Sequence, residues 1–145
     1  MKKHVLLFVS VLALFLNSCT SMKNTSKTSG LYDTTWELEY ISGPRIAFDG
    51  LFPHKKPFIK LEKSTNRASG NTGCNGFNAQ FKLEGNAISF QPGATTMMHC
   101  EGGGEQQFLK TIQQIDSYSI DQDGKLNLNM KDIAMMRFKK VADQK

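Results

Sequence analysis

The feature that most constrains this chain is a short alternation of apolar and polar residues that recurs along its length. Between Trp36 and Tyr40, apolar side chains alternate with Glu37 and Glu39. Because the side chains of a β-strand point to opposite faces in turn, this pattern predicts a strand with one buried face. The same pattern predicts strands over residues 58–62, 77–83, 88–90, 118–120, 126–130 and 133–139. Turn residues separate these segments at 42–44, 63–67, 84–86, 121–124 and 131–132, and residues 48–56 predict a loop.

One segment has a helical period instead. Phe108, Leu109, Ile112 and Ile115 recur at positions i, i+1, i+4 and i+7, which predicts a helix of about three turns. The helix cannot begin much before Glu101, because each residue of a glycine run such as 102–104 costs about 1 kcal/mol in a helix relative to alanine. A helix this short is marginal alone, so its apolar stripe must lie on the sheet.

Many short strands around a single helix predict a mainly β fold, either a small antiparallel curled sheet or a partly open β-barrel with one inserted α-helix. An open sheet of this size would leave its edges unpaired, which favours curling. The expected core consists of the large apolar side chains that share the inner face, namely Trp36, Leu38, Phe77, Phe81, Phe90, Phe108, Ile112 and Phe138.

The first 18 residues have the composition of a removable leader. Lys2 and Lys3 precede an apolar run, Val5 to Leu16, that is too short for a membrane span of roughly 20 residues. The following Leu16-Asn17-Ser18-Cys19 resembles the bacterial lipobox, which implies cleavage before Cys19 and acylation of its thiol and new amino group. The alternative is an ordinary signal peptide with an incidental cysteine.

The expected organisation is a signal peptide over 1–18, a flexible tether over 19–30, one folded domain over 31–140 and a tail over 141–145. The tether is rich in serine and threonine and has nothing to bury. No acidic residue follows Cys19, which by the rule known for enterobacterial lipoproteins predicts the outer membrane, facing the periplasm. The predicted partner is therefore the membrane, through the lipid anchor.

Length and charge exclude several classes of function. A chain of 145 residues with 39% hydrophobic residues suits one small domain and not a two-domain enzyme. Loss of Lys2 and Lys3 with the leader lowers the formal net charge from +5 to +3. The remaining lysines and arginines are spread among carboxylates, so no nucleic-acid partner is expected.

A glycine- and asparagine-rich segment surrounds the second cysteine. Residues 70–78 include Gly73-Cys74-Asn75-Gly76, a composition that predicts a tight turn whose polar groups satisfy one another. About 25 residues later comes Thr95-Thr96-Met97-Met98-His99-Cys100, and then Glu105 at the expected start of the helix.

The order of these residues resembles the META domain family, which includes the heat-shock lipoprotein HslJ. The residues that carry the resemblance run from Leu31 to Lys140 and are Trp36, Gly73-Cys74-Asn75, Phe77, Thr96-Met97, Cys100, Glu105, Phe108, Leu126 and Leu128. The resemblance implies a compact antiparallel β fold with one helix, export to the bacterial envelope, often a lipid anchor, and a link to stress. It implies no catalytic residues.

If Cys19 is acylated, Cys74 and Cys100 remain, and in an oxidising compartment such a pair most often forms a disulfide. Two free buried cysteines are the first alternative. A soft-metal site with His99 and with Met97 or Met98 is the second. Adjacent residues of a strand face opposite sides, so His99 and Cys100 could not both join Cys74, and the same argument opposes a nucleophilic cysteine with His99 as its base. No catalytic residue, metal or cofactor is therefore expected.

Other chemistry-bearing residues favour structural interpretations. His54 is expected on the surface, Glu37 and Glu39 on the solvated face of a strand, and Asp121, Asp123 and Gly124 in a turn and not in a calcium loop. The methionines of the domain are expected to lie on strands or their ends and to fill gaps in the core, with one of Met135 and Met136 pointing outward.

These observations predict a lipid-anchored envelope protein that acts without catalysis, in binding or in envelope integrity. The alternative is a protein inhibitor or a module that sequesters a small molecule. Its contact surface would be the Cys74 loop and the neighbouring loop 48–56, with Gly73, Asn75, Gly76, Thr96, His99 and Glu105 as the candidate residues. A cleft of about 300 Å³ or more near Asn75 and His99 would favour a small ligand, and an apolar surface patch would favour a protein partner. An enzyme is the third possibility.

Overall fold

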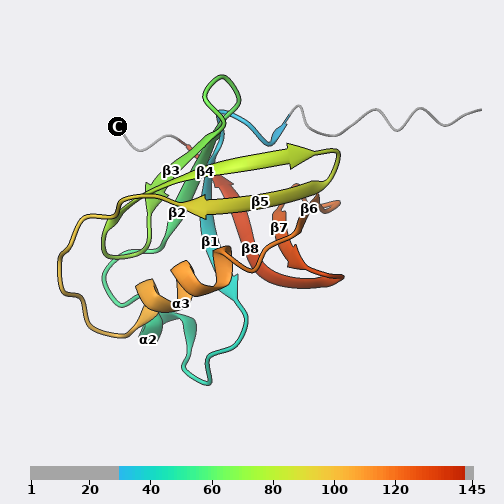
Figure 1. Cartoon of the computed structure of the whole chain (residues 1–145). Coiled ribbons are helices and arrows are strands. Elements are labelled where there is room, and N and C mark those ends of the chain that lie inside the picture. Colours follow the sequence, from blue (N-terminus) through green and yellow to red (C-terminus); the bar gives the residue numbers. More distant parts are fainter. Residues whose placement is uncertain (1–29, 143–145) are drawn as a thin grey trace, which may run out of the picture.

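Eight antiparallel strands form a closed, barrel-like ring in the computed structural model, which describes residues 30–142 (Figure 1). Neighbours in sequence are neighbours in the ring, and β8 pairs with β1 to close it. The strands are β1 (Thr35–Ile41), β2 (Phe58–Glu62), β3 (Arg67–Asn71), β4 (Gly76–Glu84), β5 (Ala87–Pro92), β6 (Ser117–Ile120), β7 (Leu126–Met130) and β8 (Ile133–Val141). The predicted mainly β, curled antiparallel fold is confirmed.

The ring is closed unevenly. Strands β4 and β5 pair along most of their length, from Ala79 opposite Pro92 to Glu84 opposite Ala87. Strands β5 and β6 share one pair, Ala87 opposite Ser117, flanked by backbone hydrogen bonds from Ile88 to Asp116 and from Tyr118 to Asn86. We call this short pairing the β5–β6 seam.

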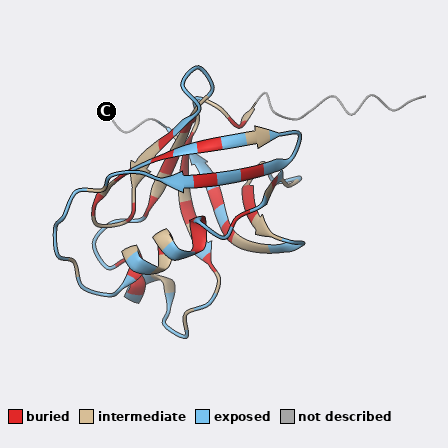
Figure 2. Ribbon diagram, in the orientation of Figure 1, coloured by how far each residue is buried: buried red, intermediate tan, exposed pale blue. Residues whose placement is uncertain are grey.

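The core fills the ring with aromatic and aliphatic side chains, and buried and exposed residues alternate along β4 and β5 (Figure 2). All eight predicted core residues are buried, and Trp36, Phe108 and Phe138 are fully so. The Trp36 indole N–H donates to the Leu31 carbonyl at 3.0 Å. Burial of this N–H without a hydrogen-bond partner would be unfavourable. Phe77 and Phe108 meet edge to face, with ring centroids 5.5 Å apart.

Helix α3 (Gly104–Ile112) lies across one end of the ring. Phe108 and Ile112 are buried, so the predicted apolar stripe does face the sheet. The helix is shorter than the predicted three turns: it ends at Ile112, and a backbone bond from Gln114 to Thr111 then turns the chain toward β6. Ile115 is still buried, but from the connection after the helix. None of the helices within residues 30–142 is long and apolar enough to cross a bilayer.

A second helix, α2 (Phe48–Leu51), occupies part of the segment 48–56 that was expected to be a loop. That expectation was wrong for its first four residues. Phe48, Leu51 and Phe52 stand at i, i+3 and i+4, which puts three apolar side chains on one side of a single turn. Leu51 and Phe52 are buried, so burial against the rest of the fold stabilises a turn too short to form alone.

Strand β3 replaces part of two predicted turns, at 63–67 and at 70–78. Its sequence, Arg-Ala-Ser-Gly-Asn, has no alternation of large apolar residues. The reason is close packing: a β-carbon at Gly70 would overlap the Phe58 carbonyl group of the neighbouring strand. Small residues are needed here, and they carry little strand signal.

The three-glycine run before α3 is explained by contact with α2. A β-carbon at Gly102 would come within 2.8 Å of the Gly50 carbonyl oxygen, and one at Gly104 would fall against the Leu51 carbonyl oxygen and the Phe52 ring. The start of α3 therefore rests directly on the backbone of α2.

We expect Gly104→Ala to lower the free energy of unfolding by about 1–3 kcal/mol, the usual cost of overpacking a dense site. Gly76→Ala is the matched control, because its new β-carbon would lie 3.8 Å from the nearest atoms. Urea denaturation measures both. Equal stability of the two variants would show that α2 and α3 can separate at no cost.

Candidate functional site

The glycine- and asparagine-rich segment forms a four-residue turn between β3 and β4. The Thr72 N–H donates to the Asn75 carbonyl at 2.9 Å, and the Asn75 N–H donates to the Thr72 hydroxyl at 3.0 Å. The Asn71 side-chain oxygen accepts the Gly73 N–H at 2.8 Å. Gly73 has φ of 94°, and a β-carbon there would lie 2.6 Å from the Phe52 ring. The predicted self-satisfied turn is confirmed for residues 72–75.

Asn75 connects this turn to the connection between β5 and α3. Its Oδ1 accepts the Thr96 hydroxyl and the Met98 N–H, both at 2.8 Å. Its Nδ2 donates to the Met98 carbonyl and to Glu105 Oε2, both at 2.9 Å. With 2% of its surface exposed, Asn75 is an internal hub and not part of a contact surface.

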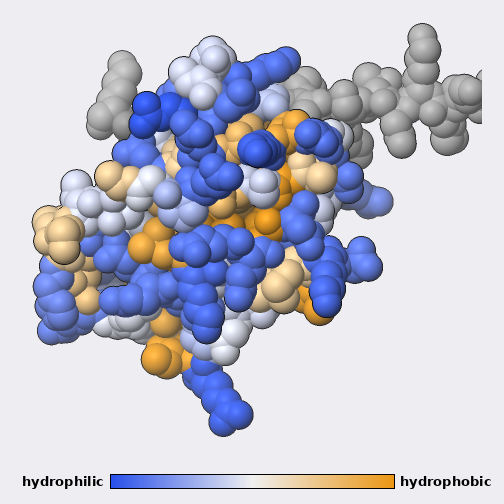
Figure 3. All heavy atoms as spheres, viewed as in Figure 1, coloured by the Kyte–Doolittle hydropathy of each residue, from blue (hydrophilic) through white to orange (hydrophobic). Residues whose placement is uncertain are grey.

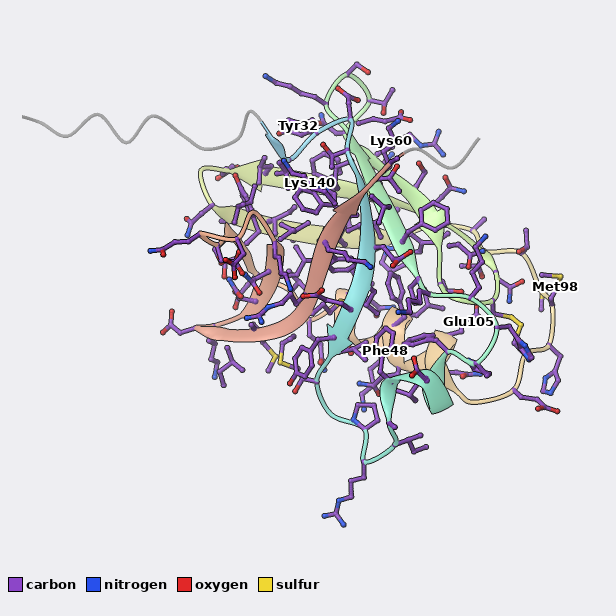
Figure 4. All side chains as sticks on the ribbon, turned by 180° about the vertical axis from the view of Figure 1, so that it is seen from behind. Tyr32, Phe48, Lys60, Met98, Glu105 and Lys140 are labelled. Atoms are coloured by element: carbon purple, nitrogen blue, oxygen red, sulfur yellow. A yellow bond between two sulfur atoms is a disulfide. The ribbon has the colours of Figure 1, made fainter. Side chains whose placement is uncertain are left out.

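Glu105 joins the same network from the first turn of α3. Its second oxygen, Oε1, accepts the Thr72 hydroxyl at 2.8 Å. Both carboxylate oxygens are thus engaged by the β3–β4 turn, and the negative charge lies near the helix N-terminus, where it is favourable. We call Thr72, Asn75, Thr96, Met98 and Glu105 the Asn75 latch. Figure 4 shows Glu105 and Met98 on the same side of the fold.

A disulfide joins Cys74 and Cys100 beside the latch, with their Cα atoms 5.9 Å apart and a sequence separation of 26. Bridged sulfurs are neither thiolate ligands nor nucleophiles, so the soft-metal and nucleophile alternatives lose the two groups on which they depended. Within residues 30–142, no three His, Cys, Asp or Glu side chains are grouped as a metal site would need.

The six predicted contact residues therefore fall into two groups. Asn75, Gly76, Thr96 and Glu105 are joined by hydrogen bonds, including one from the Gly76 N–H to the Thr96 hydroxyl at 3.0 Å. Gly73 packs on Phe52, and His99 is exposed outside the latch. Thr72 and Met98 were not among the predicted site residues. Thr72 lies inside the Gly/Asn-rich motif, which was a usable signal, whereas Met98 acts through its backbone atoms, which its residue type does not reveal.

The prediction that Met97 and Met98 lie on strands and fill the core was wrong. Met97 is 97% exposed and Met98 is 63% exposed, and residues 93–100 form no strand. The Asn75 latch holds the Met98 backbone inward, which leaves both side chains outside. Met136 is buried and Met135 is half-buried against the core.

The carboxylates for which structural roles were predicted form ion pairs and turn hydrogen bonds. Glu37 lies 3.2 Å from Lys139 Nζ, and Glu39 lies 2.6 Å from Lys125 Nζ. Asp121 accepts the N–H groups of Lys125 at 2.9 Å and Asp123 at 3.0 Å, as a turn residue does. The hydrogen bond from Lys125 is the main cause that lowers the pKa of Asp121.

Two surface hollows lie away from the latch. One, of about 370 Å³, runs over the outer face of the ring beside the loop before β2. We call it the lysine groove, and its lining residues are Thr35, Glu37, Lys55, Lys56, Phe58, Lys60, Ser69 and Val141. A second, open hollow of the same volume is lined by residues of β6, β7 and β8. Neither is the cleft near Asn75 and His99 that would have favoured a ligand there. The face seen in Figure 3 is mainly hydrophilic, with small apolar areas among polar side chains.

These features define a class: small, barrel-like antiparallel β proteins whose loops at one end are fastened by a disulfide and a buried amide–carboxylate network. The META domain family matches residues 29–143, and the chain belongs to that family. A protein from Burkholderia xenovorans with an NMR structure shares the fold, with a TM-score of 0.58 and 22% identity over 78% of this chain and 85% of that one. No curated protein matches the chain.

Proposed function

We propose that the protein is a lipid-anchored component of the bacterial envelope whose META domain acts without catalysis, in binding or in envelope integrity. The observation that carries the proposal is that the polar motif residues of the domain form hydrogen bonds within the domain. Asn75 and Glu105 bind each other and residues of the neighbouring loops. In the part of the chain that the structure describes, every buried side-chain nitrogen and oxygen has a hydrogen-bond partner.

The site is thus built for durability in an oxidising compartment. The bridge between Cys74 and Cys100 and the Asn75 latch hold the same two loops together, by a covalent bond and by charge-assisted hydrogen bonds. Disulfides form and persist mainly in oxidising compartments such as the bacterial periplasm. This supports a location outside the cytoplasm, which the leader also predicts.

The anchor rests on sequence, because Cys19 lies outside the described residues. The lipobox-like Leu16-Asn17-Ser18-Cys19 supports cleavage before Cys19 and acylation of that residue. Several acyl chains, each with about 0.8 kcal/mol per buried CH₂, hold a protein on a membrane stably. We propose the outer membrane, facing the periplasm, as its location.

Intact mass of the membrane-extracted protein tests the anchor and the bridge together. We expect a chain that begins at Cys19 with added acyl mass, and no thiol that reacts with an alkylating reagent until reductant is added, after which two react. Cys19→Ala is the control and should lose the acyl mass and the membrane association. An unacylated chain that retains its leader would contradict the anchor, and two thiols reactive before reduction would contradict the bridge.

The second candidate function is an inhibitor or sequestering module that contacts its target through the Cys74 loop. The exposure of Met97 and Met98 beside the disulfide favours it, because flexible apolar methionines suit adaptable contact surfaces. A photo-crosslinker at position 97 separates the two candidates, and position 133, where Ile133 is also exposed, is the control elsewhere on the domain. Crosslinking to one defined target from position 97 alone favours the inhibitor function.

A further inference from the structure

The lysine groove is a built concavity on the outer face of the ring. Its floor comes from outward-facing residues of β1, β2, β3 and β8, and one wall comes from the loop before β2. Figure 4 views the molecule with β1 and β8 toward the reader and marks Lys60 on this face. The volume of about 370 Å³ lies at the lower end of the range of small-molecule sites, roughly 300–1,000 Å³.

The charge of the groove is positive. The exposed loop lysines Lys55 and Lys56 supply the positive charge of its wall, and Glu37 is the carboxylate of its lining. That carboxylate is already 3.2 Å from Lys139 Nζ, a further cation at the border of the groove. A concave, partly enclosed surface concentrates the field of such a cluster, so it attracts anions more strongly than the same lysines would on a flat face.

The groove also has an apolar component. Lys55 Nζ lies 5.3 Å from the centre of the Phe58 ring, a cation–π contact between two residues of the lining. Lys56 Nζ lies 5.9 Å from the centre of the Phe48 ring, which is outside the lining. Phe58 and Val141 are half-buried, so they offer hydrocarbon to a ligand at the base of the groove.

We propose that the lysine groove binds a small anionic amphiphile, a carboxylate or phosphate joined to an alkyl or aryl group. The lysines at the wall receive the anionic group, and Phe58 with Val141 contacts the apolar part. The proposal rests on the binding role proposed above and names its ligand class, but it does not depend on the lipid anchor.

The test uses decanoate as the probe and the full chain carrying Cys19→Ser, so that no bound acyl chain competes. A ¹⁵N NMR titration should show saturable shifts at Thr35, Phe58, Lys60 and Ser69. Inorganic phosphate alone and the cationic decyltrimethylammonium are the comparison probes. We expect each to bind at least tenfold more weakly than decanoate, because each lacks one half of the recognised chemistry.

Charge reversal at the wall supplies the second measurement. Lys55→Glu with Lys56→Glu should weaken decanoate binding at least tenfold with only a small change in the thermal unfolding midpoint, since both side chains are exposed in a loop. The matched control is Lys82→Glu with Lys110→Glu, two exposed lysines outside the groove lining. It should change affinity less than twofold.

Three results would overturn the proposal: no shift at the groove residues, equal affinity for the cationic probe, or equal loss in the two double variants. Phosphate that binds as tightly as decanoate would overturn the apolar half of the recognition. Because the chain in this test carries no anchor, a failure here leaves acylation of Cys19 to be judged by intact mass alone.

Discussion

Replacing Cys74 and Cys100 together by alanine is expected to lower the free energy of unfolding by about 3–4 kcal/mol, from the chain-entropy cost of a loop of this length. The bridge joins positions 26 apart in sequence, and the loop that it closes contains all of β4 and β5 and most of the connection to α3. A domain of this size has a total stability of about 5–15 kcal/mol, so the loss is a large share of it. Urea denaturation of the oxidised protein and of the double variant measures the difference.

Met97→Ala is the matched control for the bridge. The residue belongs to the same connection as Cys100 but is 97% exposed, so its substitution should leave stability within about 0.5 kcal/mol of the parent. Addition of reductant to the parent should reproduce the loss seen in the double variant. A double variant as stable as the parent would show that the latch alone holds the two loops.

Asn75→Ala is expected to cost about 2–4 kcal/mol. A buried group left unpaired costs about 1–3 kcal/mol, and water can reach some of the partners, because Thr96 and Met98 are exposed. The groups affected are the Met98 N–H and carbonyl, the Thr96 hydroxyl and Glu105 Oε2. Asn78→Ala is the control, since Asn78 is the exposed asparagine of the adjoining strand. If both variants unfold at the same urea concentration, the Asn75 latch contributes nothing to stability.

Asn75→Asp is expected to make the free energy of unfolding depend on pH. It removes the amide donor and puts a second carboxylate against Glu105, and like charges at this distance raise the pKa of the pair in the folded state. A folded-state pKa above the unfolded value means that stability is retained below the unfolded value, near ~4, and lost as pH rises through the folded one. The variant should therefore approach the parent in stability at low pH and fall furthest behind it near neutrality.

The disulfide and the latch should not act independently. Cys74 and Asn75 are adjacent, and their partners Cys100 and Met98 are two positions apart in the other loop. Residues that restrain the same pair of segments show coupling of about 0.5–3 kcal/mol in double-mutant cycles. Loss of Asn75 should thus cost less when the bridge holds the loops in place than when it is absent.

Local pattern was enough to predict most of the sheet and its core. Trp36 and Leu38, or Phe77 and Phe81, lie on one face of a strand, and their alternation with polar residues is a property of adjacent positions in sequence. The pattern could not predict β3, because close approach between backbones at Gly70 demands small residues that carry no alternation. It also missed α2, whose one turn depends on burial against the rest of the fold.

The candidate site shows a different limit. The motif identified Asn75, Thr96 and Glu105 as belonging together, and the structure joins them through hydrogen bonds. The motif did not reveal that Asn75 is buried, so a contact surface was expected where the structure has the Asn75 latch, a network of internal hydrogen bonds. The direction of the Met97 and Met98 side chains could not be read from their sequence, because a residue more than twenty positions away sets it.

The short β5–β6 seam gains significance from what crosses it. The chain between these two strands carries α3, and a disulfide and the half-buried Glu105 carboxylate bind it to the β3–β4 turn. If the single pairing between Ala87 and Ser117 opens transiently, β5 and β6 stay connected through this restrained segment. Opening of the β5–β6 seam should therefore remain local, and the domain should unfold as one cooperative unit.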